Sequence, residues 1–482
     1  MNLATINLSA ILPAVVLSVF GIAVMVAEPF VRDRNKSRLG WLAFAGTLAA
    51  MLALFPMAES RGQWYSSIWI VDDYSVFFTF VFLLIAAVTI LTSLDFLRRE
   101  GINYSEFHAL LLFATAGMLM MSSSNELVMV FLGLEILSIA TYVLAGFRRT
   151  DLKSNESALK YFLVGSFSSA FFLYGVALIF GATGSTKLPA IAESLRSAEI
   201  QMSLVYLSAA LMLIALCFKV AVAPFHIWTP DVYEGAPTPV TGFMSVGPKA
   251  AGFAVLFRVF LTAFPTIEDR WTSAIWLVAA LTMVLGNVIA LVQPNIKRML
   301  AYSSIAHAGY VAVAFASASQ RGSSAALFYL LAYSLMNLGA FAIVTILSRS
   351  EDKTVNVTAY AGLGAKRPGL AAVLSLFLLS LAGMPGTAGF AGKFFIFRAA
   401  VESQMVWLAL IGVLTTVVSF YYYLSVIVQM YMQEPNEEFS DVRMAGSLRV
   451  ALAVSAIGTI YLGVWPTRIL DWTAAAAMNA FR

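Results

Sequence analysis

Ionisable side chains occur within several long apolar runs of this sequence. Glu135 is the eleventh residue of a run containing FLGLEILSIA, and Lys219 lies in FKVAVAPFHIWTPD. Lys160, Lys249 and Lys393 occur in ALKYFLVG, SVGPKAAGF and AGMPGTAGFAGKFF. An ionised group at mid-membrane costs at least about 2.5 to 3.5 kcal/mol, so it usually faces a protein interior, a partner or water. Groups of this kind can hold and release protons, and proton transfer is therefore the chemistry that we expect.

Glu135 and Lys219 are predicted to form a couple. Burial in an apolar surrounding favours the neutral ammonium group, whereas a carboxylate within a few ångströms favours the charged one. Lys219 is therefore expected to carry a proton, with a charge that depends on the distance to Glu135. The alternative is a buried pair that only fixes the packing of two helices.

The other candidates have similar alternatives. Lys160 begins its run and could extend its ammonium group to the interface instead of acting in transport. His226, just after Pro224, could relay protons or bond backbone groups that the proline leaves free. His307, in SSIAHAGY, could act in transport or pack against a neighbouring helix.

The composition identifies an integral membrane protein. Of 482 residues, 60% are hydrophobic and 12% are charged, which leaves too little polar surface for a soluble protein of this size. The apolar runs are too long for transmembrane strands, so the predicted class is all-α and polytopic. One cysteine and three histidines leave little scope for a cysteine-ligated cluster, haem or metal site. Basic residues are scattered over short loops, which does not suggest a nucleic-acid partner.

Fourteen membrane-spanning segments are predicted. The seventh and twelfth exceed the roughly 20 residues needed to cross and carry Pro and Gly within the run, so both are expected to be discontinuous helices. The segments are 8–28, 40–58, 74–95, 107–123, 125–147, 159–181, 204–237, 238–263, 273–293, 301–319, 323–348, 369–403, 404–432 and 448–466.

An internal repeat follows from the spacing of these segments. Four pairs of segments are separated by a nearly constant number of residues: 4 and 9, 6 and 11, 7 and 12, and 8 and 13. Segments 5 and 10 lie somewhat further apart along the chain. A shift of five segments reverses the direction of crossing, so the copies are inverted, as in many secondary transporters. The predicted division is a three-helix segment (1–106), a first five-helix repeat (107–263), a second, inverted repeat (273–432) and a C-terminal helix with a tail (448–482).

The loops predict the orientation. Lys and Arg are far more numerous in the loops on the side reached after the first segment. The positive-inside rule makes that side cytoplasmic, so both termini are expected on the outer side.

The sequence resembles a known family at several of these motifs. The stretches FKVAVAPFHIWTPDVYEGAPTPVTGF, NIKRMLAYSSIAHAGY and LSLAGMPGTAGFAGKF are similar to the antiporter-like membrane subunits of proton-pumping NADH:quinone oxidoreductase, respiratory complex I. In that family, the M branch typically has a carboxylate where this chain has Lys393. The L branch continues into further helices and a lateral arm, whereas this sequence ends at Arg482. The resemblance therefore favours the N branch.

The resemblance implies a role for each position. Glu135 would be the acidic partner, Lys219 the pumping lysine of the first broken helix, Lys249 the central connecting lysine and Lys393 the terminal lysine of the second broken helix. Lys160 and His307 match polar positions that recur less uniformly in the family.

The resemblance also implies an assembly. It predicts a multi-pass subunit of the bacterial cytoplasmic (inner) membrane, beside other antiporter-like and small membrane subunits. It places no cofactor in this chain and expects flavin, iron-sulfur clusters and quinone in partner subunits. Two alternatives remain: a subunit of the related multisubunit Na⁺/H⁺ antiporters, and a scaffold subunit without transport.

Overall fold

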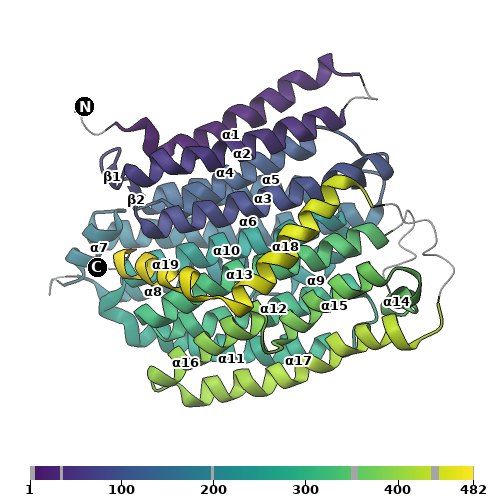
Figure 1. Cartoon of the computed structure of the whole chain (residues 1–482). Coiled ribbons are helices and arrows are strands. Elements are labelled where there is room, and N and C mark those ends of the chain that lie inside the picture. Colours follow the sequence, from purple (N-terminus) through teal and green to yellow (C-terminus); the bar gives the residue numbers. More distant parts are fainter. Residues whose placement is uncertain (1–5, 33–35, 197–199, 349–355, 436–443, 481–482) are drawn as a thin grey trace.

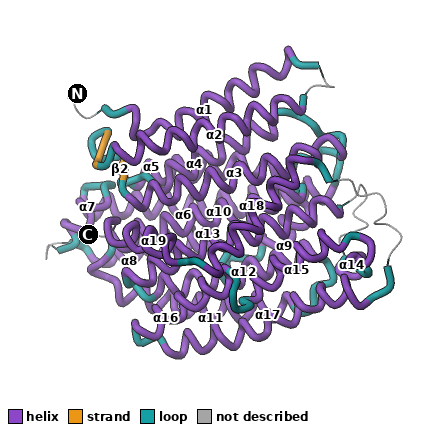
Figure 2. Tube along the Cα trace, in the orientation of Figure 1, coloured by secondary structure: helices purple, strands orange, loops and turns teal. Residues whose placement is uncertain are grey.

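The computed structural model is a bundle of long helices that run roughly along one direction (Figure 1), and it describes residues 6–32, 36–196, 200–348, 356–435 and 444–480. Helices account for nearly all of the regular structure, and the two short strands lie together near the N-terminal end of the bundle (Figure 2). The long helices are α1 Leu8–Ala27, α2 Ser37–Glu59, α3 Asp73–Arg99, α4 Glu106–Ser122, α5 Leu127–Ala145, α6 Leu152–Thr183, α8 Met202–Val220, α10 Thr238–Ala263, α11 Glu268–Ala290, α12 Ile296–Ala316, α13 Gln320–Leu347, α17 Val406–Met432 and α18 Gly446–Val464. The shorter elements are β1 Gly62–Trp64, β2 Trp69–Val71, α7 Leu188–Ser194, α9 Trp228–Gly235, α14 Leu363–Lys366, α15 Pro368–Ala382, α16 Ala388–Glu402 and α19 Thr467–Ala480.

The number of helices that can cross a membrane agrees with the predicted topology. Within the described ranges, 12 helices are long and apolar enough to cross. Helix α4, with 17 residues, and the consecutive pair α15 and α16 account for the other two predicted crossings. The all-α polytopic class is therefore confirmed.

Both predicted discontinuous helices are interrupted. Helix α8 ends where Ala221 adopts a left-handed conformation (φ 59°), and α9 begins at Trp228 after a segment that contains Pro224. Helix α15 ends where Gly383 has φ 98°, a conformation that suits glycine because it has no Cβ. The segment from Gly383 to Thr387 then separates α15 from α16. Each break leaves backbone groups without helical partners in the middle of a crossing.

The helix starts follow the inverted repeat. Helices α4, α6, α8 and α10 begin at Glu106, Leu152, Met202 and Thr238, and α11, α13, α15 and α17 begin at Glu268, Gln320, Pro368 and Val406. The fifth pair, α5 and α12, begins at Leu127 and Ile296 and is separated by a similar length of chain. The larger separation predicted for this pair was wrong, because the polar start of α12 (IKRM) hid its first turn.

Several elements outside the apolar runs were not predicted. The strands β1 and β2 form a small antiparallel hairpin, and helix α7 is only one to two turns long. Helix α19 lies in the region that was predicted as a tail. It packs against α3 and α13, with Thr473, Ala476 and Ala477 buried. Short or amphipathic elements leave no long apolar run in a sequence, so a search for such runs misses them.

A buried ion pair connects two of the central helices. Arg258 of α10 donates two hydrogen bonds to the carboxylate of Asp72, at 2.8 and 2.9 Å, and its side chain is 3% exposed. Asp72 also accepts a hydrogen bond from the backbone of Ser75 and so caps the start of α3. This pair therefore holds the Arg258 side chain inside the bundle.

Candidate proton-transfer site

Lys219 lies in the last turn of α8, immediately before the break, and its side chain is 3% exposed. Its ammonium group donates a hydrogen bond of 2.8 Å to the hydroxyl of Ser138 on α5. The Nζ atom also lies 5.8 Å from the ring centre of Tyr161 on α6. Three helices therefore surround a lysine whose nearest partner is a neutral hydroxyl group.

Glu135 lies on α5, one helical turn before Ser138, and is partly exposed. One of its carboxylate oxygens is buried without a hydrogen-bond partner. The expected couple with Lys219 is not a direct ion pair, because the two charges are more than 4.0 Å apart. A carboxylate at that distance can influence the charge of the lysine without neutralising it.

Lys249 lies near the middle of α10, which is buried along almost its whole length. Its ammonium group donates to the backbone oxygen of Ser304 at 2.9 Å and to the hydroxyl of Ser304 at 2.5 Å. The Nζ atom is 6.0 Å from the ring centre of Tyr233 on α9. Tyr233 and Tyr161 both contact Trp228, so aromatic rings line the region between Lys219 and Lys249.

His307 connects this region to the second repeat. It lies on α12, one turn after Ser304, and is 2% exposed. Its Nδ1 and Nε2 atoms form hydrogen bonds with the hydroxyls of Tyr329 and Tyr423, at 2.5 and 3.2 Å. His307 interacts electrostatically with both Lys249 and Lys393. An imidazole held between two hydroxyls can accept a proton on one side and release it on the other.

Lys393 lies on α16, directly after the second break, and is 3% exposed. Its ammonium group donates to the backbone oxygens of Leu381 and Ala382, at 2.9 and 3.1 Å. These are the last carbonyl groups of α15, where a helix carries partial negative charge. A cation at this point therefore compensates the helix end that the break exposes.

A cavity of about 760 Å³ borders Lys393 and the break at Gly383. Phe390 and Thr416 also line it. Most of its lining side chains are apolar and come from α16 and α17, so the second broken helix adjoins a largely apolar cavity at Lys393.

Lys160 is not buried, unlike Lys219, Lys249 and Lys393. Lys160 is half-exposed and binds Asp231 and Glu156, at 2.7 and 2.6 Å. Asp231 also binds Arg298, so this cluster joins α6, α9 and α12 at one end of the bundle.

His226 lies in the break between α8 and α9 and is partly buried. Its Nδ1 atom is buried without a hydrogen-bond partner, and its ring interacts electrostatically with Lys249. The expected bond to free backbone groups therefore does not form at Nδ1, which leaves this nitrogen available to a proton or to water.

The hydroxyl partners of Lys219, Lys249 and His307 do not stand out in the sequence. Ser138, Ser304, Tyr329 and Tyr423 are common residue types in apolar helices, so composition alone does not single them out. One signal was available, because Ser304 precedes His307 by one helical turn and the two must share a face of a helix. Within the described parts of the chain, no group of three or more His, Cys, Asp or Glu residues could hold a metal ion.

Fold and site together define a polytopic helical membrane protein of the ion-translocating class, with ionisable groups along its interior. The family described as NADH:quinone oxidoreductase/Mrp antiporter, transmembrane, matches residues 124–419. The chain belongs to this family.

Individual relatives and structures agree with this membership. NADH-quinone oxidoreductase subunit N of Trichlorobacter lovleyi is 47% identical over 473 residues, which cover 98% of this chain and 97% of that protein. A chain of respiratory complex I from Thermus thermophilus is 36% identical, with a TM-score of 0.81 and coverage of 96% and 99%. A chain of the Mrp complex from Dietzia sp. DQ12-45-1b is 20% identical, with a TM-score of 0.83 and coverage of 99% and 98%, and shares the fold.

Proposed function

We propose that this chain is the N-type membrane subunit of a proton-pumping NADH:quinone oxidoreductase and moves protons along its interior. The observation that carries this proposal is the row formed by Lys219, Lys249, His307 and Lys393. Each of these side chains is almost fully buried and bonded to a neighbouring helix. Buried ionisable groups are costly in a membrane, and their usual role is to form ion and proton paths.

The proposed path begins at Lys219, whose charge responds to Glu135. A proton then passes to Lys249, on to His307 and finally to Lys393. We assign Lys160 and His226 to proton uptake. Lys160 belongs to the ion-pair cluster with Asp231 of α9, and His226 interacts electrostatically with Lys249. Each transfer changes the charge that the next group experiences, so the steps depend on one another.

The domain division is part of the same proposal. Residues 107–263 and 273–432 are the two inverted repeats, each with one broken helix and one lysine beside the break. Residues 1–106 and 448–482 flank them as a three-helix segment and a C-terminal helix with its tail, and both include ends that lie outside the described ranges.

The setting that we propose is the bacterial cytoplasmic (inner) membrane, with both termini on the outer side. The partners are the other subunits of the oxidoreductase, and the bilayer surrounds the exposed apolar faces. Flavin, iron-sulfur clusters and quinone belong to those partner subunits, since the transfer of electrons from NADH requires centres that buried lysines do not provide.

Affinity purification of the chain from native membranes, followed by mass spectrometry, tests this function. Recovery of flavin-binding and iron-sulfur subunits together with NADH-dependent quinone reduction is the expected result. Recovery of antiporter subunits alone, with sodium-dependent proton flux in liposomes, would instead assign the chain to the Na⁺/H⁺ antiporters.

A further inference from the structure

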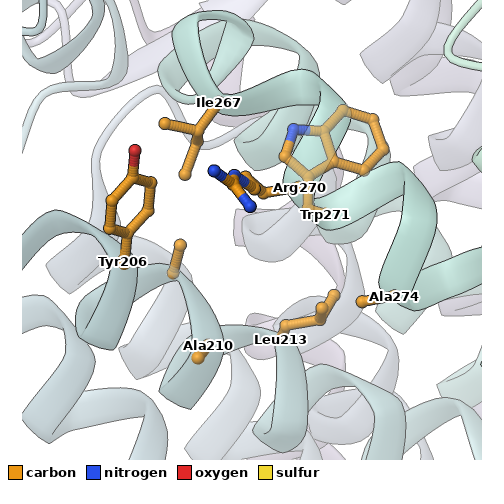
Figure 3. A pocket seen from close by; sticks show the side chains of 8 residues that line it. Tyr206, Ala210, Leu213, Ile267, Arg270, Trp271 and Ala274 are labelled. Carbon is orange, nitrogen blue, oxygen red and sulfur yellow. The ribbon is translucent and has the colours of Figure 1, made fainter.

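A groove lies between α8 and the start of α11 (Figure 3), and none of the buried lysines lines it. Its volume is about 430 Å³, and its walls come from α8 and from the start of α11. Helix α8 packs mainly on α6 and α10, whereas α11 packs mainly on α12 and α17. The two helices belong to different repeats, and the groove lies at the seam between them.

Most of the groove is apolar and built from small side chains. Ala209, Ala210 and Ala274 leave space between the helices, and Leu213 closes one end. Trp271 forms a fixed wall, because its indole N–H donates to the backbone oxygen of Phe264 at 3.2 Å and its ring stacks on Phe315. The lining of the groove is therefore largely apolar, which suits a hydrocarbon chain.

The other end of the groove carries a single cation. Arg270 extends between Tyr206 and Trp271 toward the open side (Figure 3). Within the described residues, its guanidinium group forms no ion pair and no hydrogen bond to a side chain. Arginine binds phosphate oxygens through two parallel hydrogen bonds, and Tyr and Trp are enriched where a membrane protein meets the headgroup layer.

We propose that this groove binds one membrane phospholipid, with its phosphate on Arg270 and one acyl chain along the alanines of α8 and α11. Three observations carry the proposal: the guanidinium group without a partner among the described residues, the small-residue channel and the aromatic pair beside the cation. The start of α11 also places Glu268 and Asp269 next to Arg270 in the chain. These carboxylates disfavour a strongly anionic headgroup and favour phosphatidylethanolamine, whose ammonium group they can attract.

The test uses the full chain purified in detergent and depleted of lipid. Native mass spectrometry then counts the phosphatidylethanolamine molecules that bind on titration. Arg270→Gln is expected to lower the occupancy of the tightest site about fivefold, since each cation at a lipid surface contributes on the order of 1 kcal/mol. Ala210→Phe fills the channel and keeps the arginine, so it is expected to lower the same occupancy. The control is Arg468→Gln, which removes an exposed arginine of α19 and is expected to have no effect.

Three results would overturn the proposal. The first is unchanged lipid occupancy in Arg270→Gln or in Ala210→Phe. The second comes from the assembled complex, with a photoreactive benzophenone amino acid in place of Tyr206. Cross-linking to a phospholipid supports the site, and cross-linking to a neighbouring subunit would show that a protein covers the groove. The third is tighter binding of phosphatidylglycerol than of phosphatidylethanolamine, which would contradict the headgroup assignment. None of these results depends on proton pumping.

Discussion

The ammonium group of Lys219 donates its hydrogen bond to Ser138, one helical turn from Glu135 on the same helix. A neutral hydroxyl therefore lies closest to the buried lysine, and the carboxylate acts from beyond 4.0 Å. A direct ion pair would hold the proton on Lys219, because separating two opposite charges in a low-dielectric interior is costly. In the proposed path, this arrangement would let Lys219 release its proton under the influence of Glu135.

Removal of Lys219 should stop proton transfer at the start of the path. Lys219→Ala is expected to lower the rate of NADH-driven pumping roughly a hundredfold. Groups that transfer protons typically contribute about a hundredfold to ten-thousandfold in rate, and this estimate takes the lower value. Lys219→Arg stays charged and should not restore turnover. Quenching of a pH-sensitive dye in membrane vesicles measures pumping, with assembly of the complex checked on native gels. Wild-type pumping by an assembled Lys219→Ala complex would refute the role of this lysine.

Ser138 should position the ammonium group of Lys219. A hydrogen bond to a charged group contributes about 1.5 to 3 kcal/mol, so Ser138→Ala should shift the pH profile of pumping and lower its maximum. Ser138→Thr keeps the hydroxyl and should retain most activity. Thr115→Val is the matched control, since the buried Thr115 hydroxyl donates to the backbone oxygen of Leu111 within its own helix α4. Identical pH profiles for wild type and Ser138→Ala would show that the contact has no functional role.

Tyr423 should take part in proton transfer through His307. Tyr423→Phe removes the hydroxyl that bonds His307, whereas Tyr360→Phe removes a buried hydroxyl that has no hydrogen-bond partner among the described residues. Pumping is expected to fall more in Tyr423→Phe than in Tyr360→Phe, with a larger solvent isotope effect in D₂O. Equal effects of the two substitutions would mean that the hydroxyls matter for packing alone.

The pair of Asp72 and Arg258 should be structural. Asp72→Ala leaves a buried cation without its partner, which typically costs about 3 to 5 kcal/mol of stability. Thermal unfolding of the purified chain is expected to occur at a lower temperature. The double variant Asp72→Leu with Arg258→Met removes both charges and should recover much of the loss. Loss of pumping in a fully stable double variant would assign the pair to the proton path instead.

Much of the fold could be predicted from the sequence, because a membrane restricts spanning segments to long apolar helices. The breaks near Pro224 and Gly383 could be predicted too, since Pro and Gly interrupted runs that were too long for one crossing. Helix α19 and the hairpin of β1 and β2 could not, because they lie outside the apolar runs and depend on contacts with the finished bundle.

The charged residues of the proposed path stand out in the sequence, whereas their neutral partners do not. A buried lysine is rare enough in an apolar run to be noticed, and Lys219, Lys249 and Lys393 are all almost fully buried. The partners Ser138 and Tyr423 are ordinary residues for a membrane helix. Their role depends on which helices become neighbours, and that information lies in the tertiary structure.

The central claim is that the buried lysines act as one coupled relay and not as separate sites. A double-mutant cycle on NADH-driven pumping tests it most directly, with Glu135→Gln in the first repeat and Lys393→Ala in the second. Like charges in a low-dielectric interior repel, and coupling between two sites is reciprocal. The relay therefore predicts that the double variant pumps at a rate clearly different from the product of the two single effects. If the two effects simply multiply, the lysines work independently and the relay is refuted.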